Sequence, residues 1–329
     1  MFDSINRKKA VQVLLIVMVA SALLAGIIFV VQFGPSGFSI FSSDSSYKNN
    51  VDEEKNSAAD GIQTLTVRST SENINIIPDD SSEIRAHFYG SYASSDKTFK
   101  PKLVMEKEGS NLIISIDNGN KKLTLTYLSD LKLDVYVPET FNKKFNITST
   151  SGEITAENIK AESLAIRTTS GMIAAKAIDT AGAAVGSTSG KIEIDGSFGD
   201  LEIDSTSGAI VSENLTAVET KINSTSGEIK LKGSIDGVTA GATSGTVVID
   251  TDKLTKDMAI STTSGEIIVK LPSDAGFTLG AKSQSGEINC AFPVTVSGDK
   301  KHNSLNGTVG NGRCNIALSS TSGNINIAK

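Results

Sequence analysis

Acidic side chains recur at one fixed place in a repeated pattern of this 329-residue sequence. Four glutamates directly follow a Ser-Gly pair: Glu153, Glu228, Glu266 and Glu287. Clustered carboxylates could cleave polysaccharides, and Glu266 and Glu287, in successive repeats, could share a cation. The same position holds Lys191 or Met172 in other repeats, however, so the column is better explained as a solvated polar face. A calcium site also needs more than two oxygen ligands. We therefore predict no catalytic residue, no metal site and no cofactor.

Histidines and cysteines are equally sparse, with two of each. His87 and His302 are predicted to lie at loop or capping positions, and neither has a nucleophile motif beside it. Cys290 and Cys314 share the alternation of inward apolar residues in neighbouring repeats. They are interpreted either as an extracellular disulfide or as two small buried hydrophobic residues.

Aromatic side chains are the usual platform for a carbohydrate ligand. The sequence has no Trp, and most of its tyrosines precede the repeats. The candidate ligand surface is therefore the aromatic-containing stretch 85–102, with these residues: His87, Phe88, Tyr89, Tyr92 and Phe99.

The repeat itself reads Ser/Thr-Thr-Ser-Gly-x-Ile/Val, and its clear copies mostly follow one another at intervals of 18–21 residues. Its glycines, including the degenerate copy at Gly307, are interpreted as structural corners: Gly152, Gly171, Gly190, Gly208, Gly227, Gly245, Gly265, Gly286, Gly307 and Gly323. A further copy upstream, Ser69–Ile76, carries Glu72 in place of the glycine. Gly suits a sharp corner because it adopts positive φ without steric cost.

Apolar and polar residues alternate on both sides of each corner, as in Leu201-Glu202-Ile203-Asp204. A repeat of about 19 residues cannot bury its own apolar face, so successive repeats must stack. The sequence therefore predicts an all-β fold, a parallel β-solenoid with about 19 residues per coil. Regular Thr-Ser-Gly-x-Ile coils are expected over residues 149–329.

The N-terminal end predicts a membrane anchor. Residues 13–31 are apolar except for Ser21, and this run is long enough to cross most of a bilayer as a helix. Arg7, Lys8 and Lys9 precede this run, which favours a cytoplasmic N-terminus and an extracellular C-terminal part. We expect a cytoplasmic segment at 1–10 and a transmembrane helix at 11–33 in the cell membrane. Cleavage as a signal peptide is the alternative, although the apolar run is long for one.

Two further segments separate this anchor from the regular coils. Residues 34–60 are rich in Ser, Asn, Asp and Glu, and they predict a flexible linker. Residues 61–148 predict irregular first coils that also cap the solenoid. Strand-like runs are seen at 63–68, 84–89 and 131–137, and the runs 103–106 and 112–117 suggest a hairpin.

The chain resembles a known family of bacterial proteins. The segment Leu133-Asp134-Val135-Tyr136-Val137-Pro138, the serial Thr-Ser-Gly-x-Ile repeats and the terminal Ser-Gly-Asn-Ile-Asn-Ile are similar to those of DUF4097, a family of candidate adhesins built from β-strand repeats. The resemblance covers about residues 62–329. It implies a right-handed β-helix, frequent membrane anchoring and no catalytic motif. It also implies, for some relatives, a place in the envelope-stress modules of Gram-positive bacteria.

Together these observations predict a non-catalytic, membrane-anchored extracellular protein that acts in adhesion, envelope scaffolding or surface interaction. Its partners would be the membrane and an unidentified envelope or cell-surface protein or glycan. A net charge of −6 argues against nucleic acid. The alternative is an accessory module of an envelope-stress response that acts through a membrane partner. A polysaccharide-active β-helix enzyme is the remote alternative, because no carboxylate cluster supports it.

Overall fold

The computed structural model describes residues 47–329 except 95, 120–125 and 298–302, and Lys48–Lys329 forms one compact unit. Every regular element in this part is a β-strand, which confirms the all-β prediction. Among the described residues, no helix could cross a membrane. The predicted cytoplasmic segment, the anchor at 11–33 and His302 lie outside the described residues.

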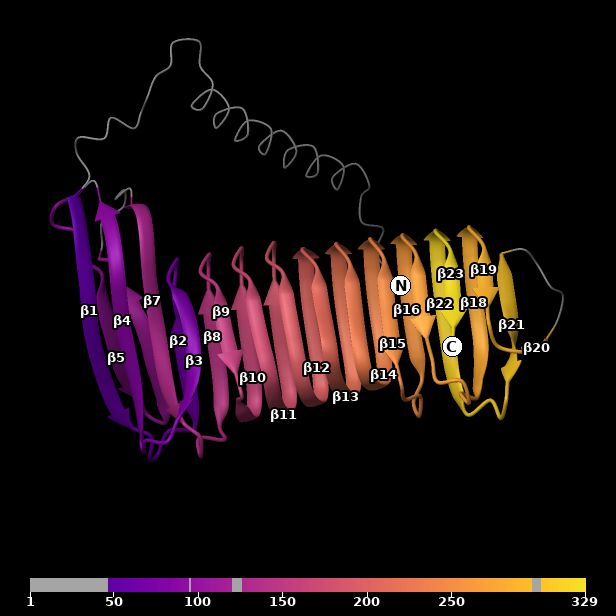
Figure 1. The fold of residues 1–329 in the computed structure, drawn as a ribbon, viewed down its shortest axis with the longest axis horizontal. Helices are drawn as coiled ribbons and strands as arrows, with labels where there is room; N and C mark the ends of the chain where they lie inside the picture. Colours follow the sequence, from indigo (N-terminus) through magenta and orange to yellow (C-terminus); the bar gives the residue numbers. More distant parts are fainter. Residues whose placement is uncertain (1–46, 95, 120–125, 298–302) are drawn as a thin grey trace, which may run out of the picture. The chain divides into compact units, whose positions relative to one another are not determined.

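Each regular coil gives one strand segment to each of two ladders (Figure 1). The pre-corner ladder holds the segments that lead into the Ser-Gly corners. Its order is β5 (Lys102–Glu108), β6 (Asn111–Asp117), β2 (Thr64–Arg68), β8 (Lys144–Ser149), β10 (Lys160–Thr168), the second halves of β11 (Ile173–Ser187), β12 (Ile192–Ser207), β13 (Ile210–Ser226) and β14 (Ile229–Ser244), then β16 (Met258–Ser264), β22 (Cys314–Ser322), β18 (Phe277–Ser285), β21 (Ser304–Val309) and β20 (Thr295–Val296).

The post-corner ladder holds the segments that leave the corners. Its order is β1 (Tyr47–Ala58), β4 (Glu83–Ser94), β7 (Thr126–Pro138), β3 (Asn73–Asp79), β9 (Ile154–Glu157), the first halves of β11 to β14, then β15 (Val247–Thr251), β17 (Ile267–Lys270), β23 (Ile325–Ala328) and β19 (Ile288–Cys290). Pairing is parallel throughout the regular coils, so the predicted stacking of repeats is confirmed.

Inward side chains stack in columns because equivalent residues of successive coils are in register. Val185 pairs with Ile203, which pairs with Ile222, and all three are buried. At the bend opposite the corner, β11 to β14 continue as bent strands with a shift of register. The apolar columns form one continuous core along the stack.

The corner glycines are required mainly by the close approach of neighbouring coils. A Cβ on Gly190 would lie 1.8 Å from the carbonyl oxygen of Gly171, and one on Gly152 would lie 2.0 Å from that of Glu72. Positive φ, which the sequence led us to expect at these corners, occurs only at four of them: Gly208, Gly227, Gly245 and Gly323. Elsewhere the missing Cβ, and not an unusual backbone angle, explains the glycine.

The C-terminal coil does not lie at the end of the stack. Strands β22 and β23 insert between the coil of β16 and β17 and the coil of β18 and β19. The segment between β19 and β22 in sequence forms β20 and β21, which pair antiparallel with each other, and β21 pairs antiparallel with β18. Gly307 lies inside β21, so its assignment as a corner glycine was wrong.

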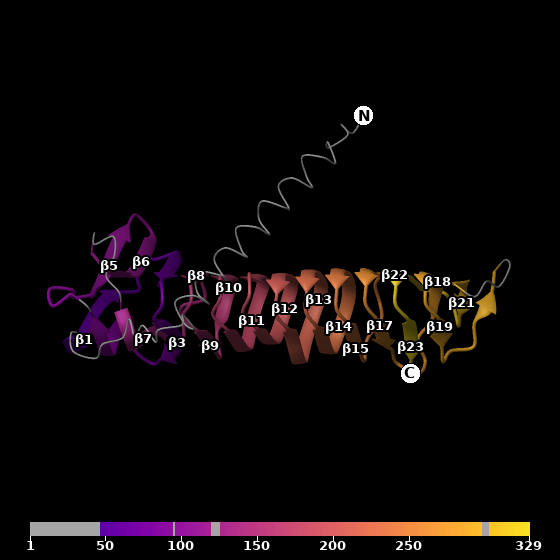
Figure 2. The ribbon, with the colours of Figure 1, turned by 90° about the horizontal axis from the view of Figure 1, so that it is seen from above.

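The N-terminal end is built in the same way. The first coil, β2 and β3, lies between the strands β6 and β7 and the coil of β8 and β9. The predicted hairpin is confirmed as β5 and β6, and β4 pairs antiparallel with β7. The prediction of a flexible linker over 34–60 was wrong for its second half, because residues 47–58 form β1, which pairs with β4. These strands form the broader end of the unit seen in Figure 2.

Candidate interaction surfaces

The five residues of the candidate ligand surface divide between the core and the outside. Phe88, Tyr92 and Phe99 are 0%, 4% and 9% exposed, so they belong to the core and cannot contact a ligand. The Tyr92 hydroxyl donates a hydrogen bond to the Phe99 carbonyl at 2.9 Å. His87 and Tyr89 point outward, because they alternate with Phe88 along β4. Of the five residues in the predicted ligand surface, only His87 and Tyr89 therefore remain candidates for contact with a ligand.

Outward side chains of β4 and β7 form a surface that the sequence did not show as a unit. Arg85 lies 4.0 Å from the ring centroid of Tyr136, and the rings of His87 and Tyr89 stack at 4.4 Å. Arg85 is paired with Tyr136 across the strands, and His87 with Asp134. We call Arg85, His87, Tyr89, Asp134 and Tyr136 the cap surface.

Asp134 fixes the position of its neighbours in this surface through hydrogen bonds. Its side chain is 8% exposed and accepts hydrogen bonds from Asn75 Nδ2 at 2.6 Å and from the Tyr89 hydroxyl at 3.0 Å. Burial, together with the bond to Asp134, raises the pKa of Tyr89 above that of a free tyrosine. Tyr89 is therefore a neutral hydrogen-bond donor at physiological pH.

Strand β1 borders the cap surface and contributes acidic partners. Asp52 Oδ1 lies 2.8 Å from His87 Nε2, and Glu54 lies 3.7 Å from Arg85. Asp79, at the end of β3, lies 3.6 Å from the same guanidinium. Arg85 and His87 of the cap surface therefore each have a carboxylate neighbour, and these polar contacts fix their positions together with the ring contacts.

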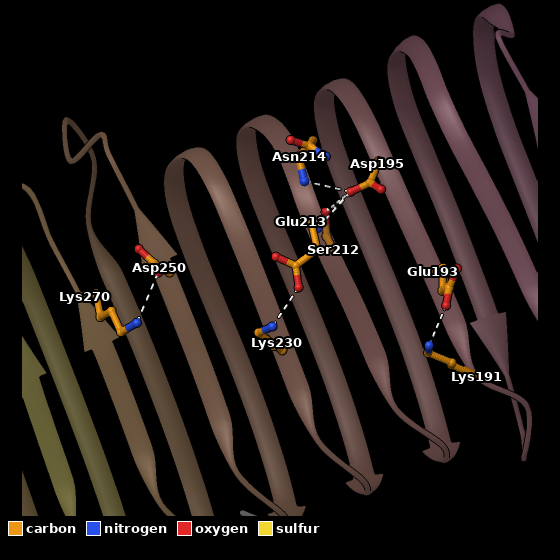
Figure 3. A network of polar contacts seen from close by, with 9 residues as sticks. All are labelled: Lys191, Glu193, Asp195, Ser212, Glu213, Asn214, Lys230, Asp250 and Lys270. Atoms are coloured by element: carbon orange, nitrogen blue, oxygen red, sulfur yellow. Dashed lines mark hydrogen bonds and ion pairs between the residues drawn. The ribbon is translucent and has the colours of Figure 1, made fainter.

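A second polar surface follows the outside of the post-corner ladder (Figure 3). Lys230 Nζ lies 2.7 Å from Glu213, and Lys270 Nζ lies 3.3 Å from Asp250. Hydrogen bonding to Lys230 lowers the pKa of Glu213. These pairs are exposed, so they neutralise the face and add little to stability.

Asp195 in this row has a local structural role. Its Oδ1 accepts hydrogen bonds from Ser212 Oγ at 2.9 Å, from Glu213 N at 2.9 Å and from Asn214 N at 2.8 Å. The three donors lie where β13 shifts register against its neighbour β14. Asp195 therefore accepts the hydrogen bonds of donor groups at the bend, where the shift of register interrupts the regular backbone pairing.

The glutamates that follow the corners do not form a site. The inserted C-terminal coil separates Glu266 from Glu287, which the sequence had led us to treat as neighbours. Glu266 Oε1 instead accepts a hydrogen bond from Asn326 Nδ2 at 2.5 Å. In the described part of the chain, no group of three or more His, Cys, Asp or Glu residues could hold a metal ion.

Both cysteines are free, which contradicts the disulfide interpretation. Cys290 lies on β19 in the post-corner ladder, and Cys314 lies on β22 in the pre-corner ladder. The two thiols are therefore in adjacent coils but on different sides of the core. Burial raises the pKa of each thiol, and Cys314 Sγ contacts the Leu254 carbonyl oxygen at 3.7 Å.

Sequence reasoning missed Asp134 and Tyr136 as members of a surface. Their alternation within β7 did indicate that they share a face, but nothing local showed that β4 would pair antiparallel with β7. Arg85, His87 and Tyr89 carry the same alternation in β4. The cap surface could therefore have been found only by knowing this long-range pairing.

The fold and these surfaces define a class of stacked parallel β-coils with antiparallel strand pairs near the ends of the stack and polar outer faces. The chain belongs to the Toastrack DUF4097 family, whose model matches residues 62–328. No curated protein matches it significantly.

Solved structures of bacterial proteins are similar to the chain at low identity. A candidate adhesin from Bacteroides fragilis is 14% identical with a TM-score of 0.42, covering 85% of this chain and 97% of its own. A candidate cell adhesion protein from Clostridium sporogenes is 14% identical with a TM-score of 0.30, covering 85% and 99%. A candidate adhesin from Parabacteroides merdae is 11% identical with a TM-score of 0.32, covering 84% and 96%.

Proposed function

We propose that this protein is a non-catalytic, membrane-anchored surface protein that binds an envelope or cell-surface partner through its cap surface. The cap surface is the observation that carries the proposal. It combines Arg85 with the rings of His87, Tyr89 and Tyr136, and Arg and Tyr are the residue types that most often dominate protein interfaces.

The preorganisation of these side chains supports the same role. Asp134 and the carboxylates of β1 and β3 hold the cap surface in one arrangement before any partner arrives. Binding would therefore lose little side-chain entropy, which favours affinity. The nine residues drawn on the post-corner face in Figure 3 include no aromatic ring, so this row lacks the rings that the cap surface offers to a partner.

Co-sedimentation tests this proposal. The full-length chain in detergent micelles is mixed with bacterial cell-wall and membrane fractions, kept separate, and bound proteins are identified by mass spectrometry. Tyr136→Ala removes the ring beneath Arg85, and the matched control Lys221→Ala removes an exposed side chain on the pre-corner ladder. We expect wild type and control to sediment with one fraction and the Tyr136 variant to lose most of this binding.

Two outcomes would count against the proposal. If the Tyr136 variant sedimented to the same extent as the wild type, the cap surface would have no part in the interaction. Retention by a single membrane protein, abolished when residues 11–33 are exchanged for an unrelated transmembrane segment, would instead favour the accessory module of an envelope-stress response.

A further inference from the structure

The bend opposite the Ser-Gly corner is closed in the regular coils but open next to the cap. In the regular coils, Ile178, Leu215 and Ile235 fill this bend and are 1%, 1% and 0% exposed. Strand β3 pairs with β9 only over Ile74–Ile76, and its residues 77–79 continue on β7 alone. Strand β9 ends at Glu157, and the next residue, Asn158, has a φ of 57°, as Ala177 has a φ of 52° in the next coil. The two neighbouring coils therefore diverge at this bend.

A cavity of about 260 Å³ occupies the space between them. Its apolar wall is made of Val137, Phe141, Phe145 and Ile159, each no more than 6% exposed. Phe141 and Phe145 meet edge to face at 5.5 Å. An apolar cavity of roughly 150 Å³ holds benzene, and drug-sized ligands need about 300 Å³ or more. This cavity therefore suits one ring or one branched side chain with a few further atoms.

Two opposite charges stand at the rim. Glu139 and Lys160 both line the cavity, and both are exposed. Neither side chain forms an ion pair or hydrogen bond with the residues that the structure describes, although Asp179 lies opposite Lys160 in the next strand. Most other lysines on the regular coils, such as Lys230 and Lys270, do have a carboxylate partner. The rim thus offers one free ammonium group and one free carboxylate beside an apolar wall.

We propose that this cavity binds a small zwitterion of the α-amino-acid class with an aromatic or branched aliphatic side chain. The side chain enters the apolar cavity, Lys160 binds the ligand carboxylate, and Glu139 binds its ammonium group. Charge complementarity at the rim selects the zwitterion over a molecule with one charge. No cap surface residue lines the cavity, although Val137 directly follows Tyr136 in β7, and the proposal does not depend on the proposed adhesion role.

Ligand-observed saturation-transfer NMR on the full-length chain tests this site. The probes are L-phenylalanine, 3-phenylpropionate, which lacks the ammonium group, 2-phenylethylamine, which lacks the carboxylate, and glycine, which lacks the ring. We expect saturable binding of L-phenylalanine, weaker binding of the two singly charged probes and no binding of glycine. Equal affinity for the three ring compounds, or no saturable L-phenylalanine signal up to about 10 mM, would overturn the proposal.

Charge variants then assign each rim residue its role. Lys160→Gln should weaken L-phenylalanine and 3-phenylpropionate about two- to fivefold and leave 2-phenylethylamine unchanged. Glu139→Gln should weaken L-phenylalanine and 2-phenylethylamine instead. Lys232→Gln, at an exposed position near the start of β14 and outside the cavity lining, is the matched control and should change nothing. Both rim residues are exposed, so thermal melting should stay at the wild-type value. A loss that is the same for all three ring probes would contradict the assigned roles.

Discussion

Replacing one corner glycine by alanine should destabilise the whole stack. At Gly190 an added Cβ would lie 1.8 Å from the Gly171 carbonyl oxygen and 2.6 Å from its carbonyl carbon. Both atoms belong to the backbone of the neighbouring coil, which is hydrogen-bonded on both sides. The clash therefore cannot be relieved by rotating a side chain, and the coils must separate locally.

The size of the effect follows from the overlap. Ordinary Cβ contacts begin near 3.4 Å, so the neighbouring coil would have to move by more than 1 Å. Overpacking a well-ordered core costs about 1–3 kcal/mol and sometimes more, and a backbone clash belongs at the upper end of that range. With about 3 kcal/mol lost and a Tm change of about 2–4 °C per kcal/mol, we expect Gly190→Ala to lower Tm by about 6–12 °C.

Circular dichroism melting of the full-length chain measures this change. Gly182→Ala is the matched control from the same coil, because a Cβ there would meet nothing within 4 Å. It should leave the Tm unchanged or raise it slightly through the reduced entropy of the unfolded chain. If the Gly190→Ala variant had the same Tm as the control, close approach of the coils could not be the reason for glycine at the corners.

Three further predictions concern buried groups. Glu72→Gln should cost about 1–3 kcal/mol in urea unfolding, because the buried carboxylate accepts hydrogen bonds from Ser69, Thr70 and Ser71 that a Gln side chain cannot all replace; an unchanged midpoint would contradict this role. Because the pKa of Tyr89 is higher in the folded than in the unfolded chain, this group contributes stability at pH values below the usual tyrosine pKa. The contribution is lost as the pH rises through the raised pKa of the folded state. Burial is the larger cause of the raised pKa and the bond to Asp134 adds to it, so Asp134→Asn should shift one tyrosine in an ultraviolet pH titration to lower pH; an unchanged titration would show that Asp134 does not contribute. A thiol reagent at pH 8 should label the half-buried Cys290 slowly and Cys314 only after unfolding, because burial raises both pKa values; rapid labelling of both would contradict their placement.

The sequence was sufficient to predict the coil itself. Alternation around the Ser-Gly pairs identified the inward columns, as with Val185 and Ile203, and the spacing of the glycines gave the length of a coil. Both features are periodic and local, and stacking is the only way for such repeats to bury their apolar faces. Even the divergent copy at Glu72 was recognised, because its flanking residues keep the pattern.

Only the tertiary structure decided which coil lies beside which, and in which direction each strand runs. The C-terminal coil fits the repeat as well as any other, yet it is inserted between two earlier coils. Gly307 lies in a segment that keeps the alternation but pairs antiparallel, since a period of two residues reads the same in either direction along a strand. The positions of Cys290 and Cys314, the cap surface and the cavity beside Lys160 all depend on these long-range pairings. Every coil edge offers the same backbone hydrogen bonds, so a local pattern cannot specify its neighbour.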